Sequence, residues 1–151
     1  MVKNVLIATF SLRVNGQRTA INGMIEPLLS FFLPKTSELD LIDGYHPGSS
    51  DVISLIEQYK KGKLVKRSKL FVSLILFPLL RLKNNNSTQS IFKIRDLFAV
   101  LEWGIRAKKK YDLFIGLESV YTLAGITLKK LGIVKKVVYY VSDYSPNRYN
   151  S

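Results

Sequence analysis

Two apolar segments, residues 111–117 and 137–141, flank one amphipathic segment in the last third of the chain. Each is short and contains β-branched or aromatic residues, which is typical of a buried strand. In the segment between them the apolar positions recur at spacings of four, four and three, a helical period: Val120, Ala124, Leu128 and Leu131. Gly132 follows directly, where a helix end is expected. The pattern predicts a strand–helix–strand unit and therefore a parallel sheet.

Polar residues follow both predicted strands: Glu118, Ser119, Asp143 and Tyr144. Ligands of parallel sheets bind beyond the carboxyl ends of the strands, so these residues are candidates for a functional site. A carboxylate there could hold acceptor hydroxyls or serve as a general base, and Arg148 could contact a diphosphate. Each acid also has a structural alternative, since Glu118 and Asp143 suit a helix N-terminus or a turn.

The chain opens with a predicted strand at residues 4–10, a loop that turns at Asn15-Gly16, and a helix. The helix is indicated by apolar residues on one face: Ile21, Met24, Ile25, Leu28, Leu29 and Phe32. Pro27 lies inside that pattern and is expected to kink the helix. A glycine-turned loop before a helix could bind an anion or a sugar phosphate, with Arg18 beside it. The alternative is that Asn15-Gly16 forms only a tight turn.

A second strand is predicted at residues 38–42, before a loop that contains His46, the only histidine. An imidazole titrates near neutral pH, so His46 could act as a general base; the alternative is a solvated loop residue. A helix is predicted from Asp51 to about Tyr59, with a serine or aspartate cap.

A longer helix is predicted after a polar, asparagine-rich break. Its apolar residues alternate spacings of three and four: Ile91, Ile94, Phe98, Leu101 and Ile105. We expect this face to be buried. Trp103 lies away from it and receives no functional role.

These elements predict a single α/β domain over residues 1–151, a Rossmann-like parallel sheet with residues 4–10 at its centre and helices on both faces. The absence of cysteine excludes disulfides and thiolate metal sites. With a single histidine as well, neither a metal site nor a bound cofactor is expected. The N-terminus lacks the pattern of a secretory signal, so we expect a cytoplasmic protein.

The net charge of +12 is concentrated in one part of the chain. Residues 58–95 form a basic-apolar excursion with ten basic and no acidic residues, whereas the rest carries thirteen basic and eleven acidic ones. Within it, residues 70–80 are an apolar run too short to span a bilayer, which needs about twenty residues. One interpretation is a buried element with solvated basic flanks, and the other is an interfacial segment on an anionic membrane. The charge bias favours the membrane, with these contact residues: Lys60, Lys61, Lys63, Lys66, Arg67, Lys69, Phe71, Phe77 and Arg81.

Four stretches carry a resemblance to a known family: NVLIATFSLRVNGQRTAI near the start, and YDLFIGLES, LKKLGI and KKVVYYVSDYSPNRY toward the end. They resemble the N-terminal half of retaining, group 1 (family 4-like) glycosyltransferases of the GT-B fold. The resemblance covers both ends of the chain well and the middle poorly. In many relatives a histidine follows the fourth strand, where this chain has Glu118.

The resemblance implies one half of a GT-B fold, the acceptor-side domain of an enzyme that moves a sugar from a nucleotide-sugar donor to a saccharide or lipid-linked acceptor. Asp143 and Glu118 would be the catalytic candidates. The substrate contacts would be Asn15, Gly16, Arg18, His46, Ser119, Tyr144 and Arg148. The donor would be held mostly by a C-terminal domain, in the same or a partner chain, for which these residues leave no room. We therefore expect this chain alone to transfer little or no sugar.

Two other functions fit parts of the sequence. A non-catalytic α/β module that docks on anionic membranes would use the basic-apolar excursion and need no second domain. Peripheral attachment to the inner face of the cell membrane is compatible with this module and with the transferase. A nucleic-acid binder fits only the charge, and no recognition helix, stacking platform or zinc motif supports it, so no nucleic-acid partner is expected.

Overall fold

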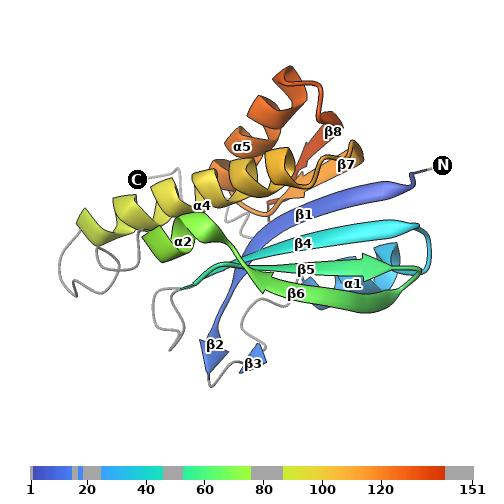
Figure 1. Cartoon of the computed structure of the whole chain (residues 1–151), viewed down its shortest axis with the longest axis horizontal. Helices are drawn as coiled ribbons and strands as arrows, with labels where there is room; N and C mark the ends of the chain where they lie inside the picture. Colours follow the sequence, from blue (N-terminus) through green and yellow to red (C-terminus); the bar gives the residue numbers. More distant parts are fainter. Residues whose placement is uncertain (1, 15–16, 19–24, 46–52, 76–86, 142–151) are drawn as a thin grey trace, which may run out of the picture.

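A six-stranded, mostly parallel sheet forms the centre of the computed structural model, in the strand order β6-β5-β4-β1-β7-β8 (Figure 1). The structure describes residues 2–14, 17–18, 25–45, 53–75 and 87–141. The sheet strands are β1 (Asn4–Ser11), β4 (Glu38–Tyr45), β5 (Leu55–Lys60), β6 (Lys63–Lys69), β7 (Tyr111–Gly116) and β8 (Val134–Tyr139). The other elements are a small hairpin of β2 (Arg13–Val14) and β3 (Gln17–Arg18), and the helices α1 (Ile25–Phe32), α2 (Phe71–Ile75), α4 (Ser87–Arg106) and α5 (Ser119–Lys130).

Four neighbouring strands run parallel: β4, β1, β7 and β8. Val5 to Ala8 of β1 are buried because helices cover both sides of the sheet, and their apolar run is therefore continuous. This arrangement confirms the predicted α/β class, the inner position of residues 4–10 and the parallel pairing of β7 with β8. The predicted strand 137–141 is displaced, because β8 already begins at Val134, which is buried and pairs with Tyr111.

The other two strands form an antiparallel hairpin at one edge, where a fully parallel sheet was predicted. The predicted helix from Asp51 to about Tyr59 is therefore wrong over residues 55–59. Side chains of β5 alternate between the two faces, with Ile56 in one core and Tyr59 against the other, which is a period of two. The turn Lys61-Gly62 has φ of 47° and 77°, as the type I′ turn of a two-residue hairpin requires.

Helices cover both faces of the sheet, as predicted (Figure 1). α1 packs on one face, and α2, α4 and α5 pack on the other. Pro27 was expected to kink the first helix from inside. It is instead the third residue of α1, in the first turn, where a proline removes no intrahelical hydrogen bond.

α4 buries a different face from the predicted one. Ile94, Phe98 and Ile105 are 49%, 49% and 59% exposed. The buried positions are Arg95, Ala99, Val100, Trp103 and Gly104. The small residues let α5 approach, since a Cβ added at Gly104 would lie 2.6 Å from the side chain of Leu128. Close packing and a buried polar group therefore decide the rotation of this helix, and the apolar row does not.

Asp40, a fully buried carboxylate of β4, joins three elements of this core. Trp103 Nε1 donates to it at 2.8 Å, the Tyr111 hydroxyl donates at 2.5 Å, and Lys109 Nζ lies 3.1 Å away. Burial and the charge of Asp40 raise the pKa of Tyr111 well above its ordinary value, so the hydroxyl remains a donor. A hydrogen bond to a charged group contributes about 1.5–3 kcal/mol, so these contacts fasten α4 and β7 to β4.

Truncation should distinguish the two faces of α4. Trp103→Ala should lower the free energy of unfolding by about 3–5 kcal/mol, because it empties a buried site and removes a donor to Asp40. Phe98→Ala, on the exposed face, should change that free energy by less than about 0.5 kcal/mol. Urea denaturation followed by circular dichroism measures both changes. Similar losses in the two variants would mean that the face containing Phe98 is buried after all.

Candidate functional site

β1 and β7 separate at their carboxyl ends, in the middle of the sheet. β1 pairs with β4 as far as Ser11, but with β7 only as far as Ala8, whose carbonyl then accepts the Leu117 amide at 3.0 Å. The chain leads from β1 toward α1 on one face of the sheet and from β7 into α5 on the other. Adjacent parallel strands whose connections leave to opposite faces form the crevice in which α/β proteins bind ligands. We therefore take the carboxyl ends of β1 and β7 as the candidate site and call this place the crevice.

Glu118 and Ser119 lie at the carboxyl end of β7, where the sequence placed them, and both are exposed. Glu118 is the N-cap residue of α5, and its carbonyl accepts hydrogen bonds from the amide and the hydroxyl of Thr122, each at 2.9 Å. Its carboxylate makes no capping hydrogen bond. The backbone of Glu118 thus serves the helix, while its side chain reaches the solvent beside the crevice.

Asp96 of α4 is a second carboxylate near the crevice, and the sequence analysis missed it. Arg95, which is fully buried, donates to it from Nε at 2.8 Å and from Nη2 at 2.5 Å. Asp96 and the buried hydroxyl of Tyr121 meet at Gly44, near the carboxyl end of β4. A Cβ there would lie 3.1 Å from the carboxylate and 2.1 Å from the hydroxyl. Burial raises the pKa of Asp96 to about 6 against the attraction of Arg95, and the charge of Glu118 adds to the increase.

Buried acids and arginines form a network at the carboxyl end of β1. Asp43 of β4 accepts hydrogen bonds from the Ser11 hydroxyl at 2.7 Å and from Arg18 at 2.9 and 3.1 Å, and it also pairs with Arg13. Arg18 continues to Glu57 of β5 at 3.2 Å. Burial alone would lower the pKa of Arg18, but the attraction of Asp43 and Glu57 outweighs it and raises that pKa. The β2–β3 hairpin therefore supplies the charge that two buried carboxylates of the sheet require.

The structure places three of the predicted site residues near this carboxyl edge. Glu118 and Ser119 border the crevice, and Arg18 lies in the neighbouring network, where it binds carboxylates of the protein itself. A substrate contact by Arg18 stays a prediction. The remaining predicted catalytic and substrate-binding residues lie outside the described residues: Asn15, Gly16, His46, Asp143, Tyr144 and Arg148.

A signal for Asp43 was present in the sequence. The strand ELDLIDGY carries three acids, of which Glu38 and Asp40 lie in the predicted strand 38–42 and Asp43 directly follows it, and a carboxylate that is buried in a sheet must find a charged or hydrogen-bonding partner. The sequence pattern did not indicate which residues would be the partners of Asp43. Asp96 gave no comparable signal, because an acid on an amphipathic helix is ordinarily solvated.

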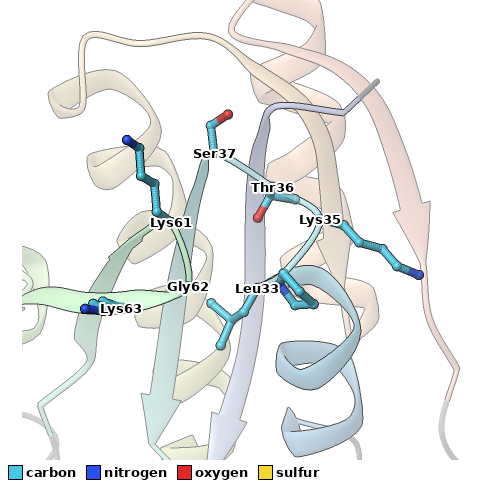
Figure 2. Close-up of a pocket in the computed structure, with 8 residues that line it drawn as sticks. Leu33, Lys35, Thr36, Ser37, Lys61, Gly62 and Lys63 are labelled. Carbon is cyan, nitrogen blue, oxygen red and sulfur yellow. The ribbon is translucent and has the colours of Figure 1, made fainter.

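A hollow of about 650 Å³ lies at the opposite, amino-terminal edge of the sheet (Figure 2). It is formed by the α1–β4 loop and the β5–β6 turn, and is lined by Leu33, Pro34, Lys35, Thr36, Ser37, Lys61, Gly62 and Lys63. In Figure 2 the side chains of Lys35, Lys61 and Lys63 point away from one another, and Lys35 Nζ lies 3.5 Å from the centre of the Phe31 ring. The three cations do not converge on one point, so the crevice is the better candidate.

The chemistry available at the crevice is that of carboxylates and hydrogen bonds. Within the described ranges no group of three or more acidic or histidine side chains is arranged to hold a metal ion. Glu118 can accept hydrogen bonds from hydroxyl groups. Asp96, with its pKa raised to about 6, can exchange a proton closer to neutral pH than an ordinary aspartate.

Asp96 should make the stability of the protein depend on pH in one direction. Its pKa is raised from 3.8 to about 6, so between those values the folded state binds more protons than the unfolded state. The contribution of Asp96 to the free energy of unfolding should therefore fall as the pH rises from about 4 to about 6. Asp96→Asn removes this titration. In urea denaturation the wild-type protein should lose stability relative to the variant across that window, and a constant difference would contradict the assignment.

Comparisons with known proteins leave the functional argument to the residues and geometry of the chain itself. No protein-family model matches the chain, no curated protein is significantly similar to it, and no solved structure matches it.

Proposed function

We propose that this chain is the acceptor-binding domain of a glycosyltransferase, with the crevice between β1 and β7 as the acceptor site. The observation that carries the proposal is the separation of these strands at Ala8 and Leu117, with the exposed Glu118 directly beyond. Four parallel strands between helical layers are compatible with half of a GT-B fold, which the resemblance of the four sequence stretches implies. The nucleotide-sugar donor would be held mainly by a second domain, in the same or a partner chain.

Glu118 and Asp96 have different tasks in the proposed site. Glu118 is exposed, and its carboxylate would accept hydrogen bonds from acceptor hydroxyls and so orient the acceptor. Asp96 is mostly buried, with 13% of its side chain exposed, and is held by Arg95; it would exchange a proton at mildly acidic to neutral pH. Asp143, which lies outside the described residues, stays a catalytic candidate on the sequence resemblance alone. In the transfer, the acceptor oxygen replaces the donor phosphate at the anomeric carbon, and its proton passes to a carboxylate or to the departing phosphate.

Saccharide binding tests the acceptor site without requiring turnover. Titration of the ¹⁵N-labelled chain with neutral oligosaccharides should shift the backbone amides of Ser11, Gly44, Glu118 and Ser119 before others. Glu118→Gln should weaken binding about tenfold, since it removes the charge from a hydrogen bond.

Glu26→Gln is the matched control, because Glu26 is an exposed acid on α1 whose only ion pair among the described residues is a long one with Arg18, at 3.8 Å. It should leave the affinity unchanged. Shifts confined to the amino-terminal edge of the sheet, or equal affinities of the Glu118 and Glu26 variants, would contradict the proposed site.

Membrane docking is the second candidate function, and α2 favours it. Phe71 and Ile75 are each 60% exposed, although Leu70 just before the helix is fully buried. The carboxylate of Glu102 accepts the first two amides of α2 at 2.9 and 2.8 Å and so holds this exposed apolar turn on α4. Cations of β5, β6 and their turn precede it, all exposed: Lys60, Lys61, Lys63, Lys66, Arg67 and Lys69. Exposed apolar side chains beside a row of cations are typical of an interfacial segment.

The same cations have a structural explanation. β6 is an edge strand, and lysines on an edge prevent pairing with another sheet. Phe77 and Arg81, also predicted to contact a membrane, lie outside the described residues. No helix within the described part of the chain is long and apolar enough to cross a membrane.

A vesicle-binding experiment distinguishes the two explanations of these cations, membrane docking and protection of the β6 edge. In the docking case the chain should bind vesicles containing anionic lipid, and salt should weaken the binding. Changing Lys60, Lys61, Lys63 and Lys66 to glutamine should remove roughly 4 kcal/mol of surface attraction. The matched control changes four exposed lysines near the other edge, Lys129, Lys130, Lys135 and Lys136, and should retain binding.

Phe71→Ser completes the test, because the exposed Phe71 can be changed without opening the core. It should abolish vesicle binding while the free energy of unfolding stays nearly constant. Equal binding by the two lysine variants, or a parent chain that ignores anionic vesicles, would leave edge protection as the explanation of the charge.

A further inference from the structure

A second hollow, of about 510 Å³, separates the C-terminal part of α4 from the β5–β6 hairpin. The hairpin lines it with Gln58, Lys60, Lys66 and Ser68, and the opposite wall includes Trp103 and Lys109. It lies on the α4 face of the sheet, toward the amino end of β4. The hollow is therefore distinct from the crevice at the carboxyl ends of β1 and β7.

Three polar side chains of this hollow have no partner in the described structure. Gln58 and Lys66 are paired residues on β5 and β6, and Ser68 lies two residues further on the same face of β6. Among the described residues, none of the three side chains makes a hydrogen bond or an ion pair. The Gln58 amide, the Lys66 ammonium group and the Ser68 hydroxyl thus line the same hollow, and each can donate a hydrogen bond to a ligand.

The charge of the lining is positive. Of the charged residues that line it, four are cations and one is a carboxylate, Glu38, which binds Lys60 at 3.2 Å. Lys109 pairs with Glu38 at 2.8 Å and with the buried Asp40 at 3.1 Å. Arg106 is held by Glu102 at 2.7 Å. The excess positive charge therefore remains at Lys66, beside Gln58 and Ser68.

We propose that this hollow binds a phosphate-bearing ligand, with the phosphate between Lys66 and Ser68 and the Gln58 amide as a further donor. A phosphate monoester carries a charge of about −1.5 to −2 at neutral pH and offers three strong acceptor oxygens, which suits these three donors. The size of the hollow is within the range of small-molecule sites, and Trp103 and Ala107 also line it, beside the rest of the ligand. The inference does not rest on sugar transfer.

Trp103 is the only tryptophan of the chain, so its fluorescence reports on this hollow. Titration of the intact chain with inorganic pyrophosphate should give a saturable change in emission. Lys66→Gln should weaken the apparent affinity about tenfold, because it removes a charge-assisted hydrogen bond, and Ser68→Ala should weaken it less. Lys136→Gln is the matched control, since Lys136 is an exposed lysine of β8 outside this hollow and outside the row of cations on β5 and β6, and it should have no effect.

The source of the phosphate is distinguished by two further probes, glycerol 3-phosphate and vesicles that contain phosphatidic acid. A response to soluble glycerol 3-phosphate supports a free phosphate compound. A response to the vesicles alone, sensitive to Lys66→Gln, supports a lipid headgroup. No saturable change with any of the three probes, or equal affinities of the Lys136 and Lys66 variants, would overturn the proposal. Oligosaccharide binding at the crevice is measured separately, so failure of one proposal leaves the other intact.

Discussion

A carboxylate in the middle of a buried strand is stable only where charged or hydrogen-bonding partners surround it. Asp40 has such partners in Trp103, Tyr111 and Lys109, which come from α4, from β7 and from the segment between them. The hydrogen bonds to the Asp40 carboxylate therefore fix both the rotation of α4 about its axis and the position of β7. The same rotation turns Arg95 toward the protein, two turns of helix away, and brings Asp96 to the end of β4. The packing of α4 in the core therefore determines where Asp96 lies in the candidate site.

Helices and strands whose sequence pattern is complete within the element itself were predicted well. The strand at residues 4–10 is continuous and apolar, and α5 combines a helical period with Gly132 at φ 71°, so neither needed knowledge of its neighbours. The β5–β6 hairpin was missed because its strands are polar and its turn is Lys-Gly, a weaker signal than Asn-Gly. For α4 the pattern identified an apolar row correctly, but the buried face was decided by Ala99, Gly104 and the contact of Trp103 with Asp40. Such partners are distant in sequence, and periodicity carries no information about them.

The candidate site was predictable only in part, for a related reason. Glu118 could be placed because a polar residue after a buried strand of a parallel sheet has a definite location. Asp43 and Asp96 could not, because their roles depend on arginines supplied by a hairpin and by a neighbouring position on α4. The basic excursion had to be reinterpreted as well. Most of its described cations belong to an integral hairpin of the sheet, so charge that resembled an added segment is part of the fold.

The contact at Gly44 limits how this protein can change during evolution. The Tyr121 hydroxyl lies 2.1 Å from the position that a Cβ at residue 44 would occupy, so no larger residue fits while Tyr121 is present. If Tyr121 first became phenylalanine, this nearest obstacle would be gone, and the Asp96 carboxylate and the Thr9 carbonyl would follow at 3.1 and 3.3 Å from a Cβ at position 44. The two substitutions are accessible in one order and blocked in the other. A change at the end of β4 is therefore coupled to a residue of α5 that lies 77 positions further along the chain.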